Sequence, residues 1–201
     1  MAARDPKATR QVILQAGQEE VYLHGFHGAS LDSIVNRAGV TKGAFFHHFP
    51  TKTDFGYHIV DELLAAMIAA QWVIPLRAVT DPLQVIAAEF EKGAEFLGRQ
   101  RPILGCPLNN LAQEMNPLDD GFRTRTSAVF DMWRASFRSA LEHGQRTSVI
   151  RADIDTASSA HALVAQIEGI LSLARNSQDP ADLTIGARGL RTHLESLRAA
   201  G

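Results

Sequence analysis

The sequence predicts an all-α protein of about nine helices, and two observations support this fold class. Apolar residues recur at the three- and four-residue spacing of a helix along nearly the whole chain, without the alternation that is typical of strands. Helix start signals recur too. Asp5-Pro6 and Asp81-Pro82 each place an acceptor side chain at the N-cap and a proline at the first helical position.

Four helices are expected in the first third of the chain. Ser30 and Thr41 can cap two short ones, because a hydroxyl at the N-cap accepts a hydrogen bond from a free backbone N–H. Gly25 and Gly39 are placed to end the helices that precede them. The four helices are expected at residues 6–25, 31–39, 42–49 and 52–72.

Five further helices are expected in the rest of the chain, separated by proline and glycine signals. The helix over 155–177 is rich in Ser, Ala and Gly, so its backbone can approach another helix closely. The five are expected at residues 82–100, 107–116, 119–144, 155–177 and 179–197.

Composition is that of an ordinary globular chain. The 201 residues carry a formal net charge of −2 at pH 7, so affinity for nucleic acid requires a focused basic patch. Cys106 is the only cysteine, which excludes an intrachain disulfide and a cysteine zinc cage. Because no apolar run is long enough to span a membrane and the N-terminus lacks the apolar core of a secretion signal, we expect a cytoplasmic protein.

Residues 31–49 have the pattern of a helix-turn-helix. Gly39 stands between two short helices as a turn residue, and Phe45 and Phe49 mark the buried side of the second helix. Two short helices that pack at a steep angle can project the second one into a DNA major groove.

The charge pattern of the same region agrees with DNA binding. Residues 33–53 contain no Asp or Glu, which avoids repulsion by phosphates, while Arg37, Lys42 and Lys52 are present. The sequence therefore predicts a DNA-binding domain at residues 1–53 and a second helical domain at 54–201.

Many residues in this first third fall at the spacing of a known family, among them glycines, aromatics, histidines and two lysines. They are Thr9-Arg10, Ile13-Leu14, Gly25-Phe26, Ser30-Leu31, Ile34, Ala38 to Gly43, Phe45 to Phe49 and Lys52. With them the chain resembles the TetR family of bacterial transcriptional regulators, closely over about the first 55 residues and beyond them in the order and length of its helices. The resemblance implies an all-helical homodimer, in which a three-helix head is joined by a fourth helix to a ligand-binding bundle.

The resemblance also implies roles for single residues. Lys42 and Ala44 take the exposed face of the recognition helix, where base edges are met, and Phe46 stands where the family usually has a tyrosine. Glu20 replaces an apolar residue, so it either lies at the domain edge or pairs with a basic neighbour. The expected DNA-contacting set is Ser30, Thr41, Lys42, Ala44, Phe46, His47, His48 and Lys52. Within this set, Thr41, His47, His48 and Lys52 are expected at phosphates.

The histidine pair allows other interpretations. Side-chain packing of His47 and His48 is one alternative to phosphate contact. Metal binding is another, but adjacent helical residues point about 100° apart and no third ligand is near in sequence. We therefore expect no metal site.

A ligand-binding bundle needs a cavity lined mainly by apolar groups with a few polar ones. The candidates are Trp72, Phe96, Cys106, Asn110, Trp133 and His161. Cys106 has two interpretations. It is either a small buried hydrophobe, which we favour, or a reactive thiol at the helix N-terminus that Pro107 opens, where the helix dipole favours thiolate. The second interpretation fits a similar Gly-Cys opening in a branch of the family with electrophile-responsive repressors.

Dimerisation is expected through the last two helices, as the resemblance implies. Their apolar residues are expected to form a four-helix seam with the partner. These residues are Leu163, Val164, Ile167, Leu171, Leu190, Leu194 and Leu197.

The sequence thus predicts a DNA-binding transcriptional regulator, most often a repressor in this family, that a small-molecule or electrophile effector releases from a palindromic operator. The alternative is a helical adaptor that binds protein and has lost DNA binding. Because the chain shows no nucleophile–base pair, no metal-ligand cluster and no phosphate loop, we expect neither an enzyme nor a cofactor.

Overall fold

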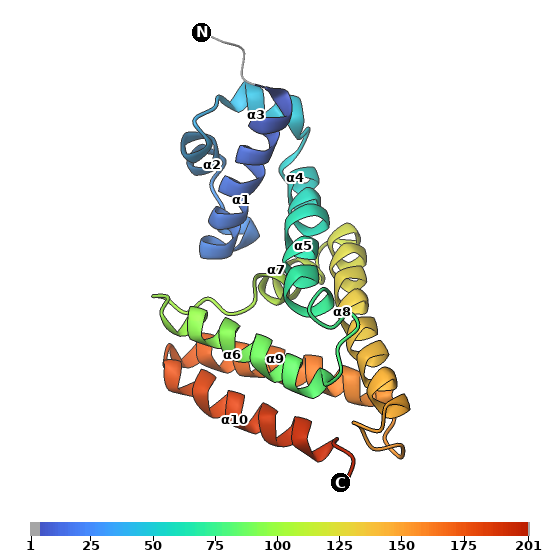
Figure 1. Ribbon diagram of the computed structural model, residues 1–201. Helices are drawn as coiled ribbons and strands as arrows, with labels where there is room; N and C mark the ends of the chain where they lie inside the picture. Colours follow the sequence, from blue (N-terminus) through green and yellow to red (C-terminus); the bar gives the residue numbers. More distant parts are fainter. Residues whose placement is uncertain (1–4, 201) are drawn as a thin grey trace. The chain divides into compact units, whose positions relative to one another are not determined.

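Helices dominate the computed structural model, which describes residues 5–200 (Figure 1). Within those residues, the only strand-like pairing is one antiparallel bridge between Ile150 and Arg198. The predicted all-α class is therefore confirmed. Residues 1–4 and 201 lie outside the described part, and the expectation about a secretion signal falls mainly on the first four.

The order of the elements matches the prediction. They are α1 (Pro6–Gly28), α2 (Leu31–Ala38), α3 (Lys42–His48), α4 (Lys52–His58), η1 (Ile59–Leu64), α5 (Ala65–Ile68), η2 (Ala69–Val73), α6 (Pro82–Gly98), α7 (Pro107–Met115), α8 (Asp120–Arg146), α9 (Thr156–Ser177) and α10 (Pro180–Ser196). The segments from α4 to η2 form one unbroken helix over 52–73, so residues 5–200 hold nine helices.

Ser30, Thr41 and Gly39 start and end the first helices as predicted, whereas α1 continues to Gly28 and Gly25 only interrupts it. The side-chain oxygens of Ser30 and Thr41 each accept a hydrogen bond from the backbone N–H three residues on, at 3.3 and 3.2 Å. Gly39 ends α2 in the left-handed conformation, with φ 62°. Gly25, with φ 76°, breaks the helical path of α1 before its last turn. Both glycines take positive φ values that side chains disfavour.

Two compact units make up the described chain. Among the described residues, the first comprises 5–66 and 107–128, and the second comprises 67–106 and 129–200. The helix-turn-helix lies in the first unit together with α7 and the start of α8. The boundary expected at residue 53 stays a prediction.

The core of the first unit is built around three phenylalanines. Phe45, Phe49 and Phe55 are fully buried, and the ring of Phe55 lies 5.0 Å from each of the other two. Gly17 of α1 lies directly against Phe55, so that a Cβ there would stand 1.9 Å from the ring. The glycine therefore lets α1 pack closely on the start of the long helix.

The second unit packs α10 against both α6 and α9, and α10 runs along α6 in Figure 1. Its aromatic centre is a stack of Trp72 on Trp133, with ring centroids 5.2 Å apart and ring planes 16° apart. The ring of Phe137 meets Trp72 edge-on at 5.6 Å. Arg198 ties the end of the chain to the N-cap of α6 through an ion pair with Asp81 at 2.9 Å.

The predicted dimer seam is wrong in most of its residues, because the chain buries them in its own core. Helical periodicity identifies an apolar face but not whether that face meets the same chain or a second one. The residues already less than a tenth exposed are Leu163, Val164, Ile167, Leu190, Leu194 and Leu197. The large apolar side chains that the two helices expose are instead Leu173 at 64% and Ile185 at 56%.

Candidate nucleic-acid interface and effector region

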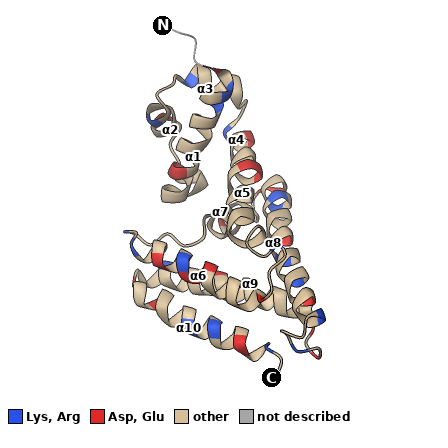
Figure 2. Ribbon diagram, viewed as in Figure 1, with Lys and Arg blue, Asp and Glu red and all other residues tan. Residues whose placement is uncertain are grey.

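The turn between α2 and α3 fixes which face of α3 is exposed. Phe45 points into the core and is fully buried, and Phe49 closes the helix from the same side. Lys42, Phe46 and His47 are consequently exposed. Basic segments lie on and near α3 in Figure 2. A duplex can therefore reach this face of the helix.

Lys42 is exposed, as a base-contacting residue must be, but it has a partner within the head. Its Nζ lies 2.7 Å from a carboxylate oxygen of Asp32 on α2, and the lysine side chain remains 55% exposed. An exposed pair of this kind contributes about 0–1 kcal/mol, so phosphate or a base edge can displace the carboxylate. Asp32 stands directly before the acid-free stretch at residues 33–53, so the charge pattern of that stretch did not reveal this neighbour.

Phe46 presents an unusual apolar surface beside Lys42. Its side chain is 48% exposed, although its ring meets that of Phe45 edge-on at 5.4 Å. An exposed phenyl ring on a recognition helix suits contact with sugars or a thymine methyl group.

The remaining expected contacts divide into exposed and partly buried groups. Ser30 and Thr41 are exposed, and their side-chain oxygens serve as helix caps. His47 is exposed, while His48 is partly buried, and their rings lie 5.3 Å apart. Ala44 is also partly exposed.

Lys52 has a structural role that the sequence did not reveal. Its Nζ donates hydrogen bonds to the carbonyl oxygens of Ala29 at 2.7 Å and His27 at 3.3 Å, and it lies 5.1 Å from the centre of the Phe26 ring. Burial lowers the pKa of Lys52, and the carboxylate of Glu114 opposes that shift. Two of its three N–H donors thus hold the end of α1, and a phosphate contact through the third stays a prediction.

Of the two alternatives for Glu20, a place at the domain edge or pairing with a basic neighbour, the structure shows pairing. Its side chain is buried, and one carboxylate oxygen accepts a hydrogen bond from the backbone N–H of Ser30 at 3.3 Å. The other oxygen lies 4.0 Å from the guanidinium of Arg37. This acid therefore helps to fix the N-terminus of α2.

Glu114 of α7 forms a clamp on the end of α1 that sequence reasoning missed. Its carboxylate accepts hydrogen bonds from the backbone N–H of Phe26 at 2.7 Å and of His27 at 2.8 Å. It also lies 2.9 Å from Nδ1 of His27. The positive φ of Gly25 turns the chain just before these two N–H groups. No local pattern could reveal this contact, because its partners are 87 and 88 residues apart in the chain.

The two tryptophans predicted for the effector region lie together in the second unit. Trp133 is 1% exposed and stacks on Trp72, and its indole N–H has no hydrogen-bond partner among the described residues. A buried donor without an acceptor is uncommon, and a ligand acceptor is one way to satisfy it.

The other predicted effector residues differ from the tryptophans in burial and in the elements that carry them. Phe96 is 65% exposed, which contradicts its assignment to a cavity lining, because the buried face of α6 passes through Phe90 and Ala94. His161 is exposed and lines a surface pocket of about 200 Å³. Cys106 is only 7% exposed, which favours its interpretation as a small buried hydrophobe. Asn110 belongs to α7 of the first unit and is partly exposed.

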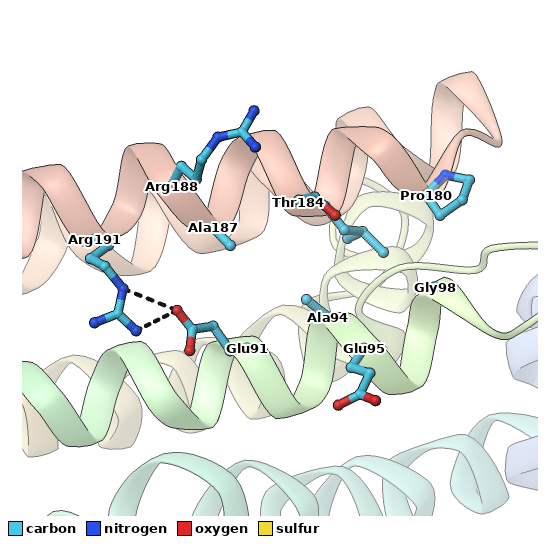
Figure 3. Close-up of a pocket in the computed structure, with 10 residues that line it drawn as sticks. Glu91, Ala94, Glu95, Gly98, Pro180, Thr184, Ala187, Arg188 and Arg191 are labelled. Carbon is cyan, nitrogen blue, oxygen red and sulfur yellow. Dashed lines mark hydrogen bonds and ion pairs between the residues drawn. The ribbon is translucent and has the colours of Figure 1, made fainter.

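A larger surface groove of about 390 Å³ lies between α6 and α10, and none of the six predicted effector residues lines it. In Figure 3, Ala94 and Ala187 face each other across it, and the ion pair of Glu91 with Arg191 closes one end. The groove exists because small side chains on the facing sides of the two helices leave the space between them unfilled.

No helix in residues 5–200 is long and apolar enough to cross a membrane. A helix-turn-helix with an exposed second helix, joined to a second helical unit, is the architecture of a DNA-binding transcriptional regulator. Comparison with known families gives the same class. Residues 13–55 match the family described as bacterial regulatory proteins, tetR family, and residues 79–190 match the tetracyclin repressor-like C-terminal domain. The chain belongs to the TetR family of transcriptional regulators.

Individual proteins agree with this assignment. The chain is 28% identical to the HTH-type transcriptional repressor DhaR of Mycobacterium sp. (strain GP1), with 97% of this chain and 98% of that protein covered. It is also 28% identical to the transcriptional regulator AcuR of Cereibacter sphaeroides, with 95% and 87% covered. A TetR transcriptional regulator from Chloroflexus aurantiacus has the same fold, with a TM-score of 0.86, 24% identity and coverage of 98% and 100%.

Proposed function

We propose that this regulator is a homodimeric repressor that binds a palindromic operator and leaves it when an effector binds the second unit. The observation that carries the proposal is the exposed face of α3, where Lys42, Phe46 and His47 stand outward from a fully buried aromatic core. Paired recognition helices of a symmetric dimer can read two half-sites in successive major grooves.

The test of this function is a mobility-shift titration of the full chain on DNA from upstream of its own coding region. We expect saturable retardation of the DNA. Unrelated DNA should compete only weakly for the protein, and the retardation should weaken as the salt concentration rises. Absence of a shift at any salt concentration contradicts it and favours the protein-binding adaptor.

Lys42→Ala is expected to weaken operator binding by about 1–3 kcal/mol and to reduce the preference for the operator over random DNA. Asp32→Asn is the matched counterpart, because it removes the carboxylate that lies 2.7 Å from the lysine ammonium. We expect it to raise affinity, by up to about 1 kcal/mol. Operator and random-sequence titrations of both variants give the measurement. Equal affinities for wild type and Lys42→Ala contradict the proposed base contact.

The proposed dimer surface is the outer face of α9 and α10. It combines small residues, which let helices approach closely, with exposed Leu173 and Ile185. A Cβ built at Gly169 meets no atom of the same chain within 4 Å, so this part of α9 is open to a partner.

Ile185→Glu is therefore expected to shift the protein from dimer to monomer and to weaken operator binding, because a charge on an apolar interface is costly. Phe96→Glu is the matched control, since it makes the same kind of change at a phenylalanine that is 65% exposed on α6. Sedimentation velocity at micromolar concentration measures both. A dimer that survives Ile185→Glu, or one that Phe96→Glu dissociates equally well, contradicts this surface.

Two features support an effector in the second unit. The buried indole N–H of Trp133 has no hydrogen-bond partner among the described residues, and the stacked aromatic rings around it offer apolar contact. A ligand that carries an acceptor group matches this chemistry. An effector needs to prefer the released conformation by about 1–3 kcal/mol to change operator affinity 5- to 150-fold.

A further inference from the structure

A surface pocket of the second unit lies outside the region expected for the effector. It has a volume of about 350 Å³ and forms between α8 and the segment that follows the long helix over 52–73. Its lining residues are Val73, Leu76, Arg77, Ala78, Val79, Met132, Ser136, Ser139, Ala140, His143 and Arg146.

The charged groups of this pocket all have basic side chains. Arg77, His143 and Arg146 line it, and no acidic residue does. Neither guanidinium forms an ion pair with any residue between 5 and 200. The nearest acid along α8, Glu142, is paired with Arg138 at 3.1 Å.

This lack of partners distinguishes the pocket from most of its surroundings. Six other arginines of the second unit are paired with acids, as Arg134 is with Asp131 and Arg191 is with Glu91. Arg101 and Arg188 also form no ion pair among the described residues, but neither lines this pocket. Two guanidinium groups beside one pocket without such acids leave a local positive potential, which favours an anion there.

The rest of the lining is apolar with two hydroxyls. Leu76 is 7% exposed, and Val73, Met132 and Ala140 add further apolar surface. The hydroxyl of Ser136 donates to the carbonyl oxygen of Trp72 at 3.1 Å, which fixes α8 to the end of the long helix. A charged rim over an apolar floor suits a ligand with one anionic and one apolar end.

We propose that this pocket binds a small organic anion. Its carboxylate or phosphate group lies between Arg77 and Arg146, with His143 beside it, and its apolar part rests on Leu76 and Met132. Guanidinium groups match the planar, two-oxygen geometry of carboxylates and phosphates better than an ammonium does. The volume falls within the range of small-molecule sites, at its lower end. The proposal concerns binding alone and does not depend on the operator.

Calorimetric titration of the full chain tests it with four probes that share one chain length. We expect hexanoate and hexyl phosphate to bind saturably at one site per chain, with affinity that falls as salt rises. Hexanol and hexylammonium lack the anionic group, and we expect both to bind at least about tenfold more weakly than the better anion. If either hexanoate or hexyl phosphate binds in this way, the site is supported, and the tighter of the two shows which head group the site prefers. No saturable binding of either anion, or hexanol binding as tightly, overturns the proposal.

Arg77→Gln and Arg146→Gln locate the site. Each is expected to weaken the binding of the better anion about tenfold or more, while Arg146→Lys keeps the charge and loses less. Arg188→Gln is the matched control, because it removes an exposed arginine of the same unit that lines the groove between α6 and α10 instead. Thermal unfolding confirms that each variant is folded. If Arg188→Gln weakens binding as much as the two pocket variants do, the anion binds elsewhere and the proposal is wrong.

Discussion

Phe45→Ala is expected to unfold the first unit and to abolish operator binding. Phe45 is fully buried, and its ring lies 5.0 Å from Phe55 and 5.6 Å from Phe49. Truncation of a buried phenylalanine costs about 3–5 kcal/mol. That is a large share of the stability of a small domain.

Urea titration can separate the two units, because both tryptophans of the chain, Trp72 and Trp133, lie in the second. Tryptophan fluorescence therefore reports the second unit, while far-ultraviolet circular dichroism reports helices in both. In Phe45→Ala we expect part of the dichroism to be lost at low urea, with the fluorescence midpoint nearly unchanged. Phe45→Leu, which keeps most of the buried volume, is the control and is expected to lose less than Phe45→Ala. If fluorescence and dichroism midpoints fall together in Phe45→Ala, the units unfold cooperatively and the expectation is wrong.

The elements of the fold were predictable because their signals are local. A hydroxyl at Ser30 or Thr41 satisfies an N–H three residues away, and Gly39 takes a conformation that side chains disfavour. Such signals need no knowledge of the tertiary structure. The exposed position of Lys42 followed in the same way, from its place just after a cap and on the side of α3 opposite Phe45.

The sequence could not show which other parts of the chain each of these side chains contacts. Phe96 and the leucines of α9 and α10 are equally apolar in sequence, yet Phe96 is 65% exposed while Leu163 and Leu190 are at most 1% exposed. Lys52 carries a charge that suits phosphate, yet it donates to carbonyls 23 and 25 residues away. Each outcome depends on which helix faces the residue, and sequence spacing within one helix does not contain that information.

Glu114→Gln is expected to destabilise the first unit by about 2–3 kcal/mol near neutral pH, because charge-assisted hydrogen bonds to two backbone N–H groups are weakened. Those bonds, from Phe26 and His27, are 2.7 and 2.8 Å long in the native protein. An amide presents only one acceptor oxygen, and its NH₂ group faces a donor. Glu114→Ala is the companion variant, since it removes the acceptor without adding a donor. Dichroism-detected urea unfolding measures both, and stability equal to wild type contradicts the role of the clamp.

The pH dependence gives a second and more specific test of the same carboxylate. Burial raises the pKa of Glu114, but the hydrogen bonds from His27 and Phe26 outweigh burial, so that its pKa is lowered overall. A carboxyl whose folded pKa is depressed stabilises the protein above its unfolded pKa of about 4.3, and that stability is lost as pH falls through the folded value. Wild type should therefore lose more stability than Glu114→Gln between about pH 5 and pH 3. Other carboxyls with lowered pKa values, such as Glu62 and Asp119, are present in both proteins and cancel in the difference. Parallel stability curves for the two proteins over that interval contradict a charged Glu114 as the group that holds the end of α1.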